Sequence, residues 1–318
     1  MKLERFYKKA VEVGIANDPR SADEIKRLLS NEAESFKDIK EDDRKAYDKD
    51  RLFNPFADTR VLHGDLGAEV TRIMVGIDID TSELLLAHTL NRDHKAGIDL
   101  VLGHHPMGEA LVRMFDVMRL QSSLLAFHGV AVSVAEQLMD QRMGEVERRL
   151  LPINATREID AARLLGLPLM CIHTAADNCV NHFLTGLFER EKPARLKDLL
   201  KLLRAVPEYD KAVGLQMAPK IVSGSEGASC GRILLEMTGG TSGSKDIYDK
   251  LAAAGVSTLV GMHISEEHLT NAKKANLNVV IAGHIASDVL GLNLLFDEIE
   301  KEAPLEFVGV SGFERIRR

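Results

Sequence analysis

Short apolar runs alternate with stretches of helical periodicity from about Arg72 to the end of the chain. Short runs that consist mostly of apolar residues, such as Ile98–Leu102, are typical of strands buried on both faces. Between them, apolar residues recur at helical spacing, as in the segment that begins at Thr81-Ser82-Glu83. Alternation of this kind predicts an α/β fold, with a largely parallel or mixed sheet flanked by helices.

The same pattern predicts the order of the elements. Strands are expected at Ile73–Ile77, Ile98–Leu102, Pro168–Ile172, Ile233–Met237, Thr258–Val260 and Val279–Ala282. In the first half, helices are expected at 81–90, at 108–150 with an interruption near His128-Gly129, and between the third strand and about residue 205. In the second half, they are expected between the fourth strand and residue 254, at 266–275 and at 289–300. Because the second half repeats the order of the first, we expect two similar lobes, roughly 61–205 and 206–318, in one domain spanning 61–318.

Residues 1–60 differ from the rest, since they are rich in Lys, Asp and Glu. Ser21 and Glu24 form a capping-box pattern before Ile25, Leu28 and Leu29 at helical spacing. We interpret this segment as a helical extension that covers an edge of the core or contacts another subunit. A catalytic role is not expected for it, because it contains no metal-type cluster.

Three of the predicted strands end in histidine or carboxylate side chains. Functional groups of α/β sheets gather at the carboxyl ends of strands, so segments far apart in sequence can form one site. The candidate metal ligands are three imidazoles and two carboxylates: His104, His105, Asp177, His284 and Asp288. His173 would donate from outside the ligand set or act as a proton shuttle. Five ligands exceed what one tetrahedral metal needs and suit a dinuclear centre, which is the leading hypothesis.

Each cluster also has a simpler interpretation. In an extended segment, His104 and His105 would point to opposite sides and serve two metals, but one could be a core histidine and the other exposed. His284 and Asp288 share one helix face, although Asp288 could instead cap the helix. Asp177 could be a turn residue. The joint position of the three clusters after strand ends favours the metal site.

Two further polar segments remain ambiguous. The glycine-rich turn Thr238–Gly243 lacks the spacing of a P-loop or a dinucleotide fold, so it could cradle phosphate or simply let a strand enter a helix. His263, Glu266, Glu267 and His268 could line a cavity as substrate contacts or form a solvated helix start.

The composition of the chain indicates which kinds of molecule it is expected to bind. The formal charge is −7, no dense Lys/Arg block occurs and there is no Trp, which argues against nucleic-acid or anionic-membrane surfaces. Three cysteines without a CxxC pair suit a reducing compartment. No signal peptide or membrane-spanning run is recognisable, so a cytoplasmic location is expected. A small-molecule substrate or a protein partner fits best.

In order, His104-His105-Pro106, His173-Thr174-x-x-Asp177 and Gly283-His284-x-x-x-Asp288 resemble the motifs of the Nif-three-like family, also labelled dinuclear metal centre proteins or GTP cyclohydrolase type two homologues. The resemblance runs from about residue 61 to the C-terminus. Three features depart from the family pattern: Asp288 replaces the usual Glu, Ala175 replaces a common Asn, and the gap between His105 and Asp177 is longer.

The resemblance implies a two-lobed α/β protein that assembles as a ring-shaped homohexamer and holds two divalent ions per chain. Carried over by motif, His104, His105, Asp177, His284 and Asp288 would be the ligands, with Asp288 bridging both ions and His173 nearby. Imidazole and carboxylate ligands without thiolate suit Zn²⁺, Fe²⁺, Mn²⁺ or Ni²⁺.

Two functions follow from this site. The first is a metal-dependent hydrolase acting on a nucleotide or phosphoester-type small molecule, as the cyclohydrolase label suggests, with acidified water attacking and His173 moving a proton. The second is a metal-binding or regulatory scaffold protein without turnover.

Overall fold

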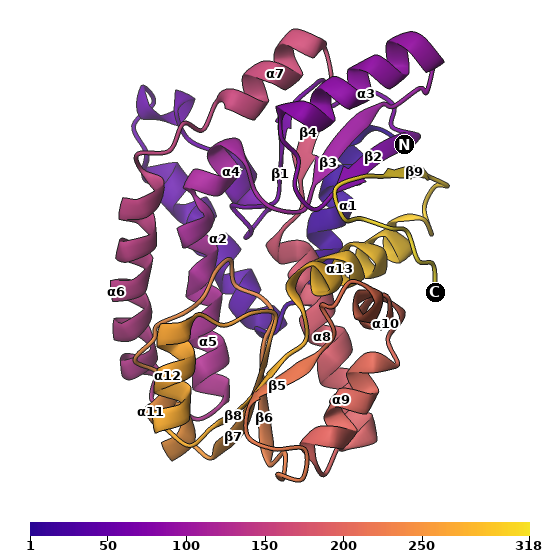
Figure 1. Cartoon of the computed structure of the whole chain (residues 1–318). Helices are drawn as coiled ribbons and strands as arrows, with labels where there is room; N and C mark the ends of the chain where they lie inside the picture. The colour runs from indigo at the N-terminus through magenta and orange to yellow at the C-terminus, as the bar shows by residue number, and fades with distance from the viewer.

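A computed structural model describes all residues, 1–318, and has a mixed α/β architecture with two sheets and flanking helices. Figure 1 shows the first sheet in the upper half of the molecule and the second in the lower half, with helices α8 and α13 crossing between them. The predicted fold class is therefore confirmed. No helix combines the length and apolar character needed to cross a membrane.

The first sheet has the strand order β1-β4-β3-β2-β9. Its strands are β1 (Arg60–His63), β2 (Arg72–Gly76), β3 (Leu100–Gly103), β4 (Leu169–Cys171) and β9 (Glu306–Gly309). β1 runs antiparallel to β4, and the other neighbours are parallel. The central strands β3 and β4 are completely buried, as their uninterrupted apolar runs predict.

The second sheet repeats this topology, because its order β5-β8-β7-β6 matches β1-β4-β3-β2 strand for strand. Its strands are β5 (Lys220–Ser223), β6 (Arg232–Glu236), β7 (Val256–Gly261) and β8 (Asn278–Ile281). The topology also aligns sequence positions that no pattern had matched. Gly64, Gly67, Ala68 and Arg72 before and in β2 correspond to Gly224, Gly227, Ala228 and Arg232 before and in β6. The two sheets thus share a strand order and four identical positions around it.

Helices connect and cover the strands. The longer ones are α1 (Leu3–Ala16), α2 (Ala22–Asp38), α3 (Thr81–His94), α6 (Val132–Leu150), α8 (Thr174–Glu191) and α13 (His284–Ile299). The shorter ones are α4 (Gly108–Val112), α5 (Arg119–Phe127), α7 (Arg157–Leu165), α9 (Leu196–Arg204), α10 (Pro207–Gly214), α11 (Tyr248–Ala253) and α12 (Glu266–Lys274). Short 3-10 helices lie at Asp43–Lys45, Lys49–Leu52 and Met114–Met118.

Helices α8 and α13 begin directly after β4 and β8 and pack against each other. Their close approach depends on Gly291, because a Cβ atom there would lie 2.6 Å from the carbonyl oxygen of Ala176. The two helices occupy equivalent places in the two lobes. Their N-terminal turns therefore bring side chains from both lobes to the middle of the molecule.

The N-terminal residues interlock with the first sheet. Phe6 and Tyr7 of α1 are buried in the same apolar cluster as Ile73 and Phe296, whereas α2 buries only Ile25. The side chain of Ser21 accepts a hydrogen bond from the backbone N–H of Glu24, which confirms half of the predicted capping box. The division into 1–60, 61–205 and 206–318 stays a proposal about folding units. β9 adds the end of the chain to the first sheet.

Most predicted elements are present, but the helix expected at 108–150 is divided into α4, the 3-10 helix Met114–Met118, α5 and α6, and only the break near His128-Gly129 was predicted. The expected helix from Val289 begins five residues earlier, at His284, because Gly283 with φ 115° is its N-cap. The pattern did not mark α7, α10 or the short strands β1, β5 and β9. The three strands have only four residues each, and few of those residues are buried. Their sequences therefore lack the apolar run that identifies a central strand.

Candidate metal centre

The tandem histidines are held by the strand before them. β3 ends at Gly103, and the backbone N–H groups of His104 and His105 then both donate to the carbonyl oxygen of Ile77, at 3.1 and 2.9 Å. The chain bends here instead of continuing extended. As a result the two imidazoles do not diverge to opposite sides, as an extended segment would require.

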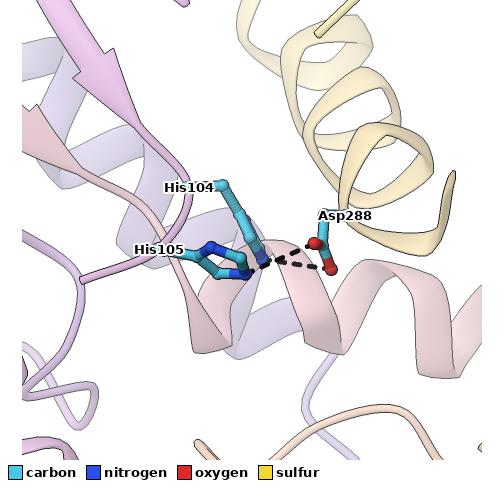
Figure 2. A group of neighbouring side chains, drawn as sticks. All are labelled: His104, His105 and Asp288. Carbon is cyan, nitrogen blue, oxygen red and sulfur yellow. Dashed lines mark ion pairs between the residues drawn. The ribbon is translucent and has the colours of Figure 1, made fainter. Parts of the chain in front are cut away.

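Both imidazoles approach one carboxylate from the other lobe. The Nε2 atom of His104 lies 3.5 Å from Oδ1 of Asp288, and Nε2 of His105 lies 3.4 Å from its Oδ2. Figure 2 shows the two rings pointing toward Asp288 across the space between the loop after β3 and α13. His104 is completely buried, while the Nδ1 atom of His105 lies 2.7 Å from Oδ1 of Asp78. The bend therefore directs both rings to a shared point.

His173 and Asp177 of the first lobe lie close to the same nitrogen of His104. Nε2 of His104 is 3.4 Å from Oδ1 of Asp177, and Nε2 of His173 is 3.9 Å from Oδ2 of the same carboxylate. Asp177 lies in the first turns of α8 and is buried, so it is a helical residue and not a turn residue. His104 thus stands between two carboxylates, one from each lobe.

His284 and Asp288 come from the equivalent helix of the second lobe. Nε2 of His284 lies 3.7 Å from Oδ2 of Asp288 on the same face of α13. Asp288 is in the second turn and is fully buried, so it does not cap the helix; Gly283 occupies that position. The spacing His-x-x-x-Asp occurs in both lobes, as His173 with Asp177 and His284 with Asp288. The fold thus places two related pairs face to face.

Asp58 is a site residue that the sequence patterns did not identify. Its Oδ2 lies 2.8 Å from Nδ1 of His173 and accepts a hydrogen bond from the hydroxyl of Thr174 at 2.6 Å. Asp58 is completely buried just before β1. No spacing signal marks it, because 115 residues separate it from His173.

Many polar atoms of these side chains have no hydrogen-bond partner. They include Nε2 of His104 and His105, Oδ1 of Asp177 and both carboxylate oxygens of Asp288, although all are buried. Buried polar atoms without partners are rare and costly, so a cluster of them calls for a ligand. His104, His105 and Asp288 form one group whose ligand atoms lie within 4.8 Å of one another, and His104, His173 and Asp177 form a second. These groups could hold a metal ion, and their nitrogen and oxygen donors fit a divalent transition metal.

The histidine and aspartate side chains of the cluster shift each other's pKa values. Burial alone would lower the pKa of His104, but the carboxylates of Asp288 and Asp177 raise it to about 10. Burial would raise the pKa of Asp288, but the charge of His104 and its contacts with both tandem histidines hold it well below its usual range. Burial lowers the pKa of His284 despite the nearby Asp288. Without a metal, protons on His104 neutralise carboxylates that a cation would otherwise neutralise.

A cavity of about 110 Å³ lies beside the cluster between the lobes. His173, Asp177, His284 and Asp288 form part of its wall. The predicted turn Thr238–Gly243 and two of the predicted contacts, His263 and His268, also line it, whereas Glu266 and Glu267 do not. A cavity of this volume has room for about one small ring.

Comparison with known proteins gives structural relatives only. No family model and no curated protein matches the chain. A NIF3 superfamily protein from Sphaerobacter thermophilus has a similar structure, with a TM-score of 0.70, 28% sequence identity, and coverage of 80% of this chain and 91% of that chain. Reduced HcgD from Methanocaldococcus jannaschii is similar in fold, with a TM-score of 0.50, 16% identity, and coverage of 78% and 87%.

Proposed function

Given that the chain belongs to the Nif-three-like family, we propose that it is a dinuclear metal protein that hydrolyses a small molecule of the nucleotide or phosphoester type. The observation that carries the proposal is the set of buried, unpartnered nitrogen and oxygen atoms contributed by both lobes. Polar atoms that only face solvent do not need to be buried. Polar atoms that bind a cation can be buried without a protein partner, because the cation pairs with them.

His104, His105, Asp177, His284 and Asp288 would hold the two ions. Asp288 is suited to bridge them, because each of its oxygens faces a different histidine of the tandem pair. Its side chain is one methylene shorter than the Glu that the family usually has, and the bend at His104 and His105 brings both rings close enough to reach it. Zn²⁺, Fe²⁺, Mn²⁺ and Ni²⁺ all suit this donor set.

The ions, when bound, would supply Lewis acidity that polarises the scissile bond and lowers the pKa of water. The chain itself supplies a proton acceptor. Because the Nδ1–H group of His173 donates to Asp58, its Nε2 carries a lone pair directed at the cluster. His173 is therefore placed to take a proton from water and to pass it to a leaving group.

The cavity favours turnover over simple ion storage. It joins the cluster to walls that contain ten hydrophobic residues, which a storage site for ions would not need. No lysine or arginine lines it, so an anionic group of the substrate has no side-chain cation to bind. Such a group would have to lie at the metal end, and the organic part would lie against the apolar walls.

The first test is elemental analysis of protein purified without added metal. We expect about two divalent ions per parent chain and fewer than one in the Asp288→Asn variant, which removes the shared charge but keeps the side-chain volume. The Asp65→Asn variant, altered in an exposed turn, is the matched control and should match the parent. A parent chain that stays metal-free even after reloading would sink the proposal.

Hydrolysis is tested separately with bis(p-nitrophenyl) phosphate and a panel of nucleotides. The His173→Gln variant should keep its metals and lose at least about 100-fold in turnover if Nε2 handles protons. Loss of metal in this variant would instead make His173 a ligand. Protein with two metals and no turnover on any substrate would leave the non-catalytic scaffold.

Assembly and location remain part of the proposal. By resemblance to the family we expect a homohexamer, whose mass would be about six times the 35.1 kDa of one chain. Light scattering on the eluting protein measures this directly. We further propose a cytoplasmic location, which agrees with three free cysteines.

A further inference from the structure

Glu236 is the last residue of β6 and lies at the carboxyl end of the second sheet, where ligands of α/β proteins bind. Its register partner on β7 is Gly261, just as Gly76 at the end of β2 pairs with Gly103. Glu236 therefore occupies the position that Gly76 holds in the first lobe. The second lobe carries a carboxylate at a point where the first lobe carries no side chain.

The carboxylate of Glu236 has no partner in the protein. It forms no hydrogen bond or ion pair with any side chain, and it faces the same cavity as the metal-type cluster. Most other acidic residues of the second lobe are paired, as Glu267 is with Lys245. Because no lysine or arginine lines the cavity, nothing in the chain neutralises this charge.

The surroundings of Glu236 are apolar. Leu234, two residues earlier on the same face of β6, and Ile247 line the same cavity. Although the side chain is exposed to the cavity, the surrounding walls displace bulk water and raise the pKa of Glu236 to about 7. A hydrogen bond to a carboxylate that is partly shielded from bulk water is stronger than one made in water.

One further polar group lies close by. The hydroxyl of Tyr248 is 2.7 Å from Nδ1 of His268, and both residues line the cavity. The negative charge of Glu236 adds to the burial that raises the pKa of this tyrosine. Tyr248 and His268 satisfy each other, which leaves Glu236 free to accept hydrogen bonds.

We propose that Glu236 is the recognition end of a small-molecule site spanning the cavity, and that it binds an N–H donor group, an amine or an amidine-like edge. The opposite end of the same molecule would lie at His284 and Asp288. The role of Glu236 as the far end of a substrate rests on the proposed function, but the carboxylate subsite itself does not require metal.

Benzamidine and benzylamine are suitable probes, because they carry the two donor types on a planar apolar body. Acetophenone has a similar size and no N–H donor, so it reports apolar binding alone. Calorimetry with the full chain should show that both donor probes bind the parent more tightly than acetophenone. Glu236→Gln should lower their affinity about 10-fold, which is the effect expected for a lost charge-assisted hydrogen bond.

Glu266→Gln is the matched control. Glu266 is an exposed, unpaired carboxylate of the same lobe that does not line the cavity, so its loss should leave binding unchanged. Equal binding of the donor probes to the parent and to Glu236→Gln would overturn the proposal. So would an equal loss in both variants, which would indicate a general charge effect.

A second pair of probes tests the span to the cluster. In metal-loaded protein, para-aminomethyl-phenylphosphonate should bind about 10-fold more tightly than para-tolylphosphonate, and Glu236→Gln should abolish the difference. No difference in the parent would overturn the spanning arrangement. If the chain binds no metal while benzamidine still depends on Glu236, the proposed function fails and the recognition site stands.

Discussion

The Nδ1 atom of His173 lies 2.8 Å from Oδ2 of Asp58, which comes from the segment just before β1. The contact joins a residue at the start of the first sheet to the start of α8, inside the core. A carboxylate behind a histidine fixes the tautomer and the orientation of the ring. Asp58 is therefore a positioning residue for the candidate metal centre.

Substituting Asp58→Asn should reverse the direction of the hydrogen bond between this side chain and His173. The amide can donate to Nδ1 of His173, which would move the ring proton to Nε2 and direct it at the cluster. We expect turnover of the model phosphodiester to fall about 10-fold to 100-fold, with the metal content unchanged. Initial rates and elemental analysis measure these two quantities, and nitrogen NMR of the imidazole reports the tautomer, which a merely structural role would not change. Unaltered turnover together with an unaltered tautomer would contradict this role.

The metal-free protein should lose stability as the pH rises. The pKa of His104 is about 10 in the folded chain against an ordinary value of 6.5, so the folded state holds this proton more tightly. The resulting stabilisation is complete below about pH 6.5 and is lost as the pH approaches 10. Thermal unfolding of stripped protein between these values should show a declining midpoint. In the His104→Gln variant the midpoint should decline less over this pH range. If the midpoints of parent and variant decline in parallel, the proton on His104 does not contribute to the stability.

Metal binding should release protons at neutral pH. A histidine must be deprotonated to bind a metal, and His104 carries its proton at pH 7.5 in the metal-free chain. Calorimetric titration in two buffers of different ionisation enthalpy measures the number released. We expect at least about one proton per chain in the parent and fewer in His104→Gln. An observed heat that does not depend on the buffer would argue against a protonated His104.

The close packing of α13 on α8 should not tolerate a side chain at Gly291. A Cβ atom there would lie 2.6 Å from the backbone oxygen of Ala176, one residue before Asp177. We expect Gly291→Ala to destabilise the fold by about 1–3 kcal/mol and to weaken metal binding, because the helices carry ligands of both lobes. Urea unfolding and metal content measure the two effects.

Gly186 on α8 provides the control for this change. Nothing lies within 4 Å of a Cβ atom built there, so Gly186→Ala should stabilise the helix by about 0.5–1 kcal/mol. Equal effects of the two substitutions would show that helix propensity, and not the contact between the helices, determines the result at Gly291.

Helix α1 should be necessary for the first lobe. Phe6 is fully buried and its ring centroid lies 6.4 Å from that of Phe296. We expect Phe6→Ala to cost about 3–5 kcal/mol in urea unfolding. Leu29→Ala on α2, where the side chain is only partly buried, should cost clearly less. Similar costs would mean that α1 and α2 act as one appended unit.

The positions of the candidate ligands could be predicted because they depend on local pattern. Each lies just after a short apolar run, and β3, β4 and β8 form where those runs occur. The four-residue spacing of His284 and Asp288 placed both on one helix face before any contact was known. The observed start of α13 at His284 strengthens that inference, since it removes Asp288 from the capping position.

Other features depend on contacts between distant residues, which no local pattern contains. Asp58 lies in a polar segment that resembles surface loops, and only the fold buries it against His173. Glu236 looks like the polar end of a strand until the two lobes enclose it in one cavity. The repeated order of elements was expected from the sequence, but the spatial order of the strands in each sheet was not.

By itself the sequence determined the α/β class, the central strands and the histidine and aspartate residues at their ends, because hydrophobic periodicity and residue spacing express local geometry. Only the tertiary structure decided that the clusters of both lobes meet around His104. That meeting depends on how closely α8 and α13 pack at Gly291 and on how the chain bends after β3. The first is packing between residues 115 positions apart, and the second rests on hydrogen bonds to Ile77, 27 and 28 positions before the two histidines. The spacing of residues along the chain carries no information about either contact.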